Sequence, residues 1–135
     1  MNTKEHKLSI LIIDDEEELL DSLQLLLSSR FNITTASNAI IAYDLLNKNP
    51  LDHDIIITDM TMKKMSGMDF YSKIKATHPG VEKRMIFMTG NIYSEHIHEF
   101  INKIDNPVLE KPFNIADLLK TIQRIVNKSS DIVSG

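Results

Sequence analysis

One stretch of the sequence decides the fold: residues 53–62, HDIIITDMTM. Three consecutive isoleucines, Ile55 to Ile57, followed by Thr58, fit a strand that is buried on both faces, as strands of a parallel sheet are. The strand would end at Asp59. Parallel-sheet proteins bind their ligands at the carboxyl ends of the strands. The stretch therefore predicts a central parallel strand with a carboxylate at its functional end.

The sequence on either side of this stretch repeats one pattern. Four further apolar runs have the length and composition of strands: residues 8–13, 31–36, 84–88 and 107–110. Apolar residues at helical spacing indicate helices over residues 16–28, 39–46, 68–77, 97–104 and 114–126. Because strands and helices alternate through short loops, we expect parallel strands joined by right-handed crossovers, with helices on both faces. The fold class is a doubly wound α/β domain.

Composition sets the limits of the domain and of its function. The chain of 135 residues, 42% hydrophobic and 25% charged, fits one globular domain, which we place at residues 8–127 between a flexible tail (1–7) and a C-terminal tail or linker (128–135). A net charge of -4 gives no support for nucleic-acid binding, and the absence of cysteine excludes disulfides, thiolate metal sites and thiol catalysis. The apolar run at 8–13 is too short for a membrane span or a signal peptide and leads into five acids, so we expect a soluble, cytoplasmic protein.

Polar side chains follow four of the five expected strands. Asp14 and Asp15 follow the first, Asp59 the third, Thr89 the fourth and Lys111 the fifth. In a parallel sheet these ends lie on one edge, and two bare carboxylates about 4 Å apart repel by roughly 4 kcal/mol at an effective dielectric constant of 20. A divalent cation with oxygen ligands, Mg²⁺, would offset that repulsion, with Asp15 and Asp59 as ligands.

This combination suits phosphoryl transfer. With a metal ion and the Lys111 ammonium nearby, Asp59 would stay ionised and could attack a phosphoryl group to form an aspartyl phosphate. The reaction needs mainly positioning and neutralisation of the phosphoryl oxygens, which Mg²⁺, Lys111 and the Thr89 hydroxyl would provide. Taken singly, each residue has a plainer explanation: Asp14 and Asp15 as helix-capping acids, Asp59 as a loop acid, Lys111 as a solvated lysine. Their joint placement carries the hypothesis.

The same residues carry a resemblance to a known family. From Leu8 to about Asn127 the sequence resembles the receiver domain of two-component response regulators. The matching motifs are IIDDE at 12–16, ITDMTM at 57–62 with Gly67, MTG at 88–90 and EKPF at 110–113. The run NPVLEKPF at 106–113 is similar to receivers attached to hybrid histidine kinases.

The resemblance implies a flavodoxin-like (βα)5 fold with sheet order 2-1-3-4-5. It implies that Asp59 is phosphorylated by a phosphohistidine on a partner histidine kinase or histidine phosphotransfer protein. It also implies that Mg²⁺ is bound by Asp15, Asp59 and the backbone carbonyl of Thr61, with Asp14 acting through water.

The resemblance further implies how a phosphorylated site would act. Thr89 would be the switch hydroxyl, Lys111 the counter-charge of the phosphoryl group, and Lys111-Pro112 a cis peptide. The fourth helix, fifth strand and last helix would form the face read by a downstream target, or by a second copy in a phosphorylation-dependent homodimer. The chain would be a signalling switch without an output domain and not a turnover enzyme.

Two positions depart from the family pattern. Lys63 stands where the family commonly has proline, and Val108 stands where an aromatic side chain usually follows the movement of the switch hydroxyl. Because valine has no ring to bury or expose, the usual route from the site to the surface is missing at Val108.

Two other functions compete with the signalling hypothesis. A haloacid-dehalogenase-like phosphohydrolase also uses an aspartyl nucleophile, but on its first strand and with a second Asp two residues on, where this chain has Thr61. A receiver-like interaction module that ignores phosphorylation is favoured only by Val108. His96 and His98 do not share a helix face and so indicate no metal site, and His6, His53 and His78 are expected at the surface.

Overall fold

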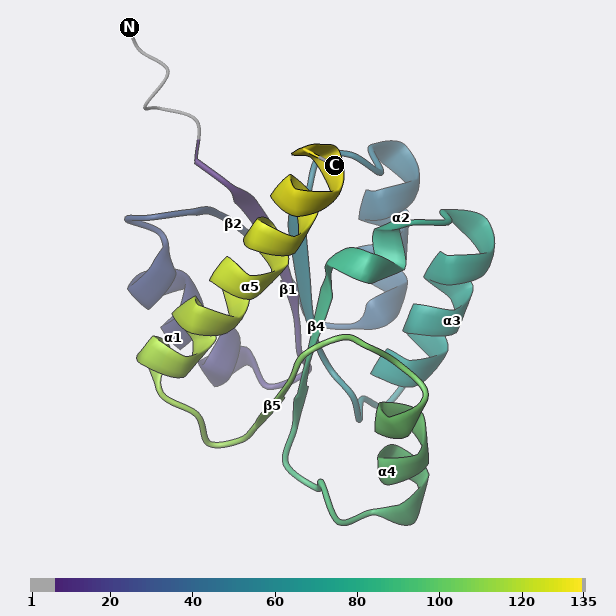
Figure 1. Ribbon diagram of the computed structural model, residues 1–135. Helices are drawn as coiled ribbons and strands as arrows, with labels where there is room; N and C mark the ends of the chain where they lie inside the picture. The colour runs from purple at the N-terminus through teal and green to yellow at the C-terminus, as the bar shows by residue number, and fades with distance from the viewer. Residues whose placement is uncertain (1–6, 135) are drawn as a thin grey trace, which may run out of the picture.

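The computed structural model describes residues 7–134, so that only Lys7 of the expected N-terminal tail lies within the described part of the chain (Figure 1). The elements in chain order are β1 (Ser9–Ile13), α1 (Glu17–Leu27), β2 (Asn32–Ala36), α2 (Ala39–Lys48), β3 (Ile55–Asp59), α3 (Gly67–Thr77), the 3-10 turn η2 (Val81–Arg84), β4 (Met85–Thr89), α4 (Glu95–Asn102), β5 (Val108–Glu110) and α5 (Ile115–Ser134). The expected alternation of strands and helices is confirmed.

The strands form one parallel sheet in the order β2-β1-β3-β4-β5. This is the flavodoxin-like order that the resemblance implied, with β3 and its three isoleucines between β1 and β4. Every residue of β3 is buried, which explains its unbroken run of β-branched side chains.

Two hydrophobic cores lie on the two faces of the sheet. Ile10, Ile12 and Ile57 point to the core beneath α1 and α5, whereas Leu11 and Ile13 point to the core beneath α2, α3 and α4. Figure 1 shows this division, with α1 and α5 on one side of the sheet and α2, α3 and α4 on the other. Adjacent strand residues alternate between faces, so one apolar run serves both cores.

The strand register brings the polar ends of the strands to one edge. Ile13 pairs with Thr58, Asp59 with Met88, and Thr89 with Glu110. Asp14 and Asp59 therefore lie at neighbouring positions, and the residues after β4 and β5 lie at the same end of the sheet.

Helix α5 is longer than expected. It continues through Ser134, so residues 128–134, which the sequence indicated as tail or linker, are helical. Residues 113–134 contain no glycine or proline, so no helix-breaking residue supported the expected end of the helix at residue 126. None of the described helices is long and apolar enough to cross a membrane.

The expectation that His53 lies at the surface is wrong. Its exposed fraction is 8%, and burial lowers its pKa. His53 lies just before β3, where the chain enters the centre of the sheet, and its carbonyl accepts a hydrogen bond of 2.9 Å from the guanidinium of Arg84. Within residues 7–134, its Nδ1 atom has no hydrogen-bond partner.

Candidate functional site

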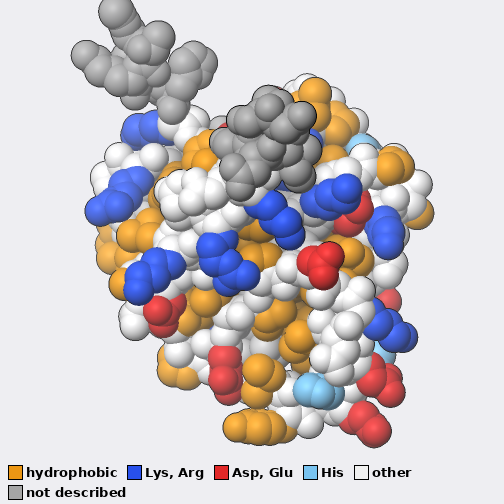
Figure 2. Space-filling view, in the orientation of Figure 1, with side chains coloured by type: hydrophobic (Ala, Val, Ile, Leu, Met, Phe, Trp, Pro, Cys, Tyr) orange, Lys and Arg blue, Asp and Glu red, His pale blue; other side chains and the backbone are white. Residues whose placement is uncertain are grey.

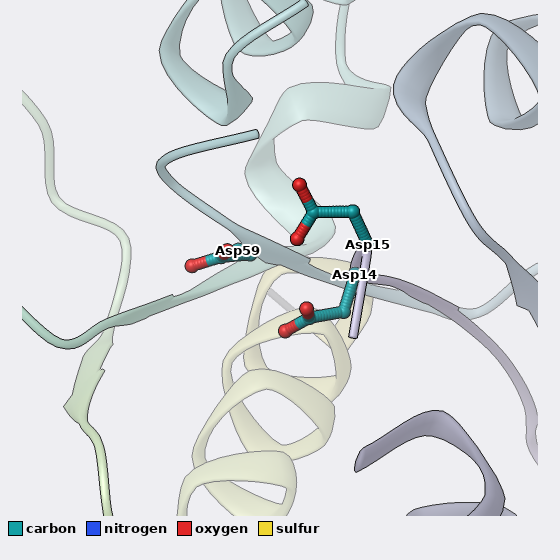
Figure 3. A group of neighbouring side chains, drawn as sticks. All are labelled: Asp14, Asp15 and Asp59. Atoms are coloured by element: carbon teal, nitrogen blue, oxygen red, sulfur yellow. The ribbon is translucent and has the colours of Figure 1, made fainter. Parts of the chain in front are cut away.

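Three carboxylates converge at the carboxyl edge of the sheet. Asp14 and Asp15 follow β1, and Asp59 is the last residue of β3. One oxygen from each can be chosen so that all three atoms lie within 4.8 Å of one another. Figure 3 shows the three side chains projecting to the same side of the strand ends. Asp14 is fully buried, Asp59 is 7% exposed and Asp15 is exposed, so the cluster opens to solvent on the Asp15 side.

Lys111 faces this cluster from the end of β5. Its Nζ lies 2.8 Å from Asp14 Oδ2 and 3.6 Å from Asp59 Oδ1. A third carboxylate, Glu16, lies 3.4 Å from the same ammonium group. Glu16 is not among the site residues that the sequence predicted, and its position two residues after Asp14 is the one sequence signal for this contact.

Burial, together with the neighbouring carboxylates, raises the pKa of Asp59 to about 6. Burial is the largest cause, and the negative charges of Asp14 and Asp15 add to it. The Lys111 charge and a hydrogen bond from the Thr61 backbone act in the opposite direction. The ionised form of Asp59 is therefore destabilised by burial and by the neighbouring carboxylates, and a cation bound beside it would reduce this destabilisation.

The same carboxylates stabilise the charged form of Lys111. Burial alone would lower the pKa of Lys111, but its hydrogen bond to Asp14 and the charge of Asp59 outweigh burial and raise the pKa. A fixed positive charge therefore lies on one side of the carboxylates at any pH near neutrality.

The donor set fits a hard divalent cation. Three carboxylates on one open edge supply only oxygen donors, and such sets suit Mg²⁺ with retained waters. Asp14 already accepts hydrogen bonds from the Glu16 backbone and from Lys111, which leaves Asp15 and Asp59 freer to act as direct ligands. The carbonyl of Thr61 as a ligand stays a prediction.

Thr89 ends β4 and is buried, with an exposed fraction of 1%. Its hydroxyl oxygen accepts a hydrogen bond of 3.1 Å from the backbone N–H of Asn91. Its carbonyl accepts one of 2.7 Å from the backbone of Lys111, and the following Lys111-Pro112 bond is cis. Thr89 and Lys111 are thus joined through their backbones, while the role of Thr89 as a switch stays a prediction.

Gly67 has a structural role that the sequence motif alone did not explain. Its backbone N–H donates to the Met60 carbonyl at 2.9 Å, closing the loop after β3. A Cβ atom at this position would collide with the carbonyl oxygen of Asp59. Only glycine permits this approach, so Gly67 sets the path of the loop that contains Thr61.

Val108 lies on β5 directly opposite Phe87 of β4. The Phe87 ring packs against Phe100 of α4 and Tyr71 of α3, with ring centroids 5.4 and 5.7 Å away. Three aromatic rings therefore lie on the α3–α4 side of β4, the strand that ends in Thr89. They lie next to Val108, the position at which the family usually has a further aromatic side chain.

Comparison with known proteins agrees with this geometry. The sequence profile of the "Response regulator receiver domain" family matches residues 10–123. The C4-dicarboxylate transport transcriptional regulatory protein DctR of Rhodobacter capsulatus is 38% identical over 104 residues, which cover 76% of this chain and 52% of DctR. The sensor kinase CckA of Brucella abortus is 22% identical over 121 residues, 89% of this chain and 13% of the kinase. The chain thus spans about half or less of the length of these two relatives.

Solved structures are similar over nearly the whole chain. The crystal structure of a response regulator receiver domain protein from Clostridium thermocellum superposes with a TM-score of 0.79 at 29% identity, covering 93% of this chain and 98% of that one.

Proposed function

This chain belongs to the response regulator receiver domain family, and on that basis we propose that Asp59 accepts a phosphoryl group from a phosphohistidine of a histidine kinase or histidine phosphotransfer protein in the cytoplasm. The observation that carries the proposal is the position of Asp59 at the end of β3, 3.6 Å from Lys111 and beside Asp14 and Asp15. A carboxylate so placed is suited to act as a nucleophile, with one counter-charge, Lys111, already in position.

In the proposed reaction a carboxylate oxygen of Asp59 attacks phosphorus in line with the phosphorus–nitrogen bond of the phosphohistidine. That bond breaks, its electron pair returns to the imidazole nitrogen, and the product is an aspartyl phosphate. Lys111 stabilises the phosphoryl oxygens, and the Thr89 hydroxyl, whose oxygen accepts from the Asn91 backbone N–H, donates its own proton to a phosphoryl oxygen. Mg²⁺ held by Asp15 and Asp59, with the Thr61 carbonyl, would neutralise developing charge on the phosphoryl group.

Phosphorylation would replace the single negative charge of the Asp59 carboxylate by a phosphoryl group with about 1.5 to 2 negative charges, beside the carboxylates of Asp14 and Asp15. The segment after Thr89 and helix α4 directly follow the switch residue in the chain, so we expect their conformation to change first. The face formed by α4, β5 and α5 would then bind a downstream target or a second copy of the chain.

The direct test is the intact mass of the protein after incubation with acetyl phosphate and Mg²⁺. We expect one added phosphoryl group on the native chain and none on Asp59→Asn, which keeps the shape of the side chain without its charge. Absence of the adduct, or an equal adduct on Asp59→Asn, would contradict the proposal. Omitting Mg²⁺ tests the metal separately, since the adduct should then form much more slowly.

A further inference from the structure

A groove lies at the end of the sheet opposite Asp59, among the segments that precede β4 and β5. One cavity of about 730 Å³ is bounded by α3, η2, the connection between α4 and β5, and α5. A second cavity, of about 480 Å³, lies between α3 and α4. The two share four lining residues, Tyr71, Lys75, Lys103 and Ile104, and so adjoin. We call the pair the α3–α5 groove.

The rim of the α3–α5 groove is basic although the protein is acidic. Five basic side chains line the larger cavity: Lys75, Lys83, Lys103, Arg124 and Lys128. All five are exposed, and only two acids, Glu82 and Asp105, line the same cavity. This local excess of positive charge stands in a chain of net charge -4. Figure 2 shows Lys and Arg side chains gathered over this face, around hydrophobic atoms.

Apolar side chains lie between these charges. Pro107 and Ile125 are buried, Ile104 is half-buried, and Phe100 extends the apolar lining into the second cavity. An apolar lining with a charged rim is typical of grooves that take the apolar face of an amphipathic segment.

The walls of the groove are held in place without a ligand. The side-chain amide of Asn106 donates to the carbonyls of Glu82 and Met85, at 2.8 and 2.9 Å, and so fixes the connection between α4 and β5. The Tyr71 ring packs against Phe87 and Phe100 at centroid distances of 5.7 and 5.4 Å. A preformed groove loses little conformational entropy when it binds.

We propose that the α3–α5 groove binds an acidic amphipathic segment of a partner protein, with the apolar face of the segment on Tyr71, Ile104 and Ile125 and its carboxylates on the basic rim. Two adjoining cavities make an elongated site, which suits a helix or an extended peptide better than a compact ligand. A phosphate backbone offers no apolar face to cover Ile104, Pro107 and Ile125, so a nucleic acid is the less favoured occupant. The proposal goes beyond phosphorylation of Asp59, because none of these residues belongs to that site.

The first experiment uses the full chain and a synthetic helical peptide with Glu on its polar face and Leu and Phe on its apolar face. Titration followed by amide chemical shifts should move the signals of Tyr71, Ile104 and Ile125. A peptide of the same composition but scrambled order should bind about tenfold more weakly, since it presents no apolar face. Equal binding of the scrambled peptide, or shifts confined to other surfaces, would overturn the proposal.

Charge reversal tests the rim. The double variant Lys103→Glu, Arg124→Glu should bind the peptide at least about tenfold more weakly than the native chain. The matched control Arg30→Glu, Lys48→Glu has the same change in net charge at exposed positions of the α1 and α2 region and should stay within about twofold. Equal losses in both variants would mean general electrostatic attraction and overturn the proposal.

Three further measurements complete the test. A single-stranded DNA oligonucleotide that bound more tightly than the peptide, with the same dependence on Lys103 and Arg124, would replace the proposed occupant by a nucleic acid. The groove variant should still be labelled at Asp59 by acetyl phosphate, so that failure of this proposal and failure of the phosphorylation proposal give different results. Unchanged thermal unfolding of both variants verifies that they are folded.

Discussion

The ammonium group of Lys111 lies closer to Asp14 than to Asp59: Nζ is 2.8 Å from Asp14 Oδ2 and 3.6 Å from Asp59 Oδ1. Asp14 has no exposed side-chain surface, whereas Asp59 retains some. The lysine therefore offsets a fully buried charge first, and its contact with the proposed phosphoryl acceptor is the longer of the two. Both the stability of the edge and its reactivity depend on this arrangement.

Replacing Lys111 by methionine should destabilise the protein. The change leaves Asp14 buried without its partner, and breaking a buried pair in this way should cost about 2–4 kcal/mol in free energy of unfolding. Denaturant unfolding measures the loss, and the exposed Lys120→Met on α5 is the control. Mg²⁺ should restore part of the loss, because a bound cation supplies the missing positive charge. Equal stability of the two variants would mean that the Lys111–Asp14 pair contributes little.

The raised pKa of Asp59 can be measured directly. In the metal-free protein, the carboxyl carbon signal of Asp59 should titrate near pH 6, and the signal should be absent from Asp59→Asn. Mg²⁺ should lower this pKa, because a cation beside the carboxylate favours the ionised form. A titration near the ordinary value of 3.8 would show that burial and the neighbouring acids do not act as the geometry indicates.

Asp59→Asn should stabilise the metal-free protein at neutral pH. Because the folded-state pKa is raised, ionised Asp59 favours unfolding above about pH 6, and removing the charge relieves this by about 1–3 kcal/mol. The gain should shrink as the pH falls through 6 and vanish below the unfolded-state pKa near 3.8, where both states of the native chain are protonated. Denaturant unfolding at pH 7.5, 5 and about 3.5 measures this trend. A stability difference that did not change with pH would have another origin.

Gly67→Ala should damage the loop after β3. The new methyl group would collide with the Asp59 carbonyl, so the backbone must shift at a cost of about 2 kcal/mol or more. Labelling of Asp59 by acetyl phosphate should slow as well, since Thr61 lies on the displaced loop. For the unfolding measurement Gly90→Ala is the matched control, because apart from the two chain neighbours no atom lies within 4 Å of a Cβ at that position. If the two variants unfolded at the same temperature, the close approach at Gly67 would not be limiting.

Beryllofluoride, a stable analogue of the phosphoryl group on Asp59, should report whether the site communicates with β4 and β5. We expect changes in the amide signals of Thr89, Phe87 and Val108, because Thr89 lies two residues from Phe87 on β4 and Phe87 pairs with Val108. Asp59→Asn should show no such changes. If the native chain also showed none, the alternative of an interaction module that ignores phosphorylation would gain support.

The sequence by itself determined the layers of the fold and the edge that carries the site. Strands rich in β-branched residues alternate with helices, and that order leaves a parallel sheet whose carboxyl ends meet, so Asp14, Asp15, Asp59 and Lys111 had to lie at one edge. The local sequence pattern suffices for this, because each parallel strand places the polar residue at its carboxyl end on the same edge of the sheet.

Only the tertiary structure decided distances between segments far apart in the chain. Lys111 and Asp14 are separated by 97 positions, and which carboxylate lies nearest to the ammonium group depends on strand register and side-chain packing. The same holds for the approach of Gly67 to Asp59, the burial of His53 and the basic groove formed by α3, α4 and α5. Composition and periodicity specify which face of an element is apolar, whereas close contacts arise when several such elements pack together.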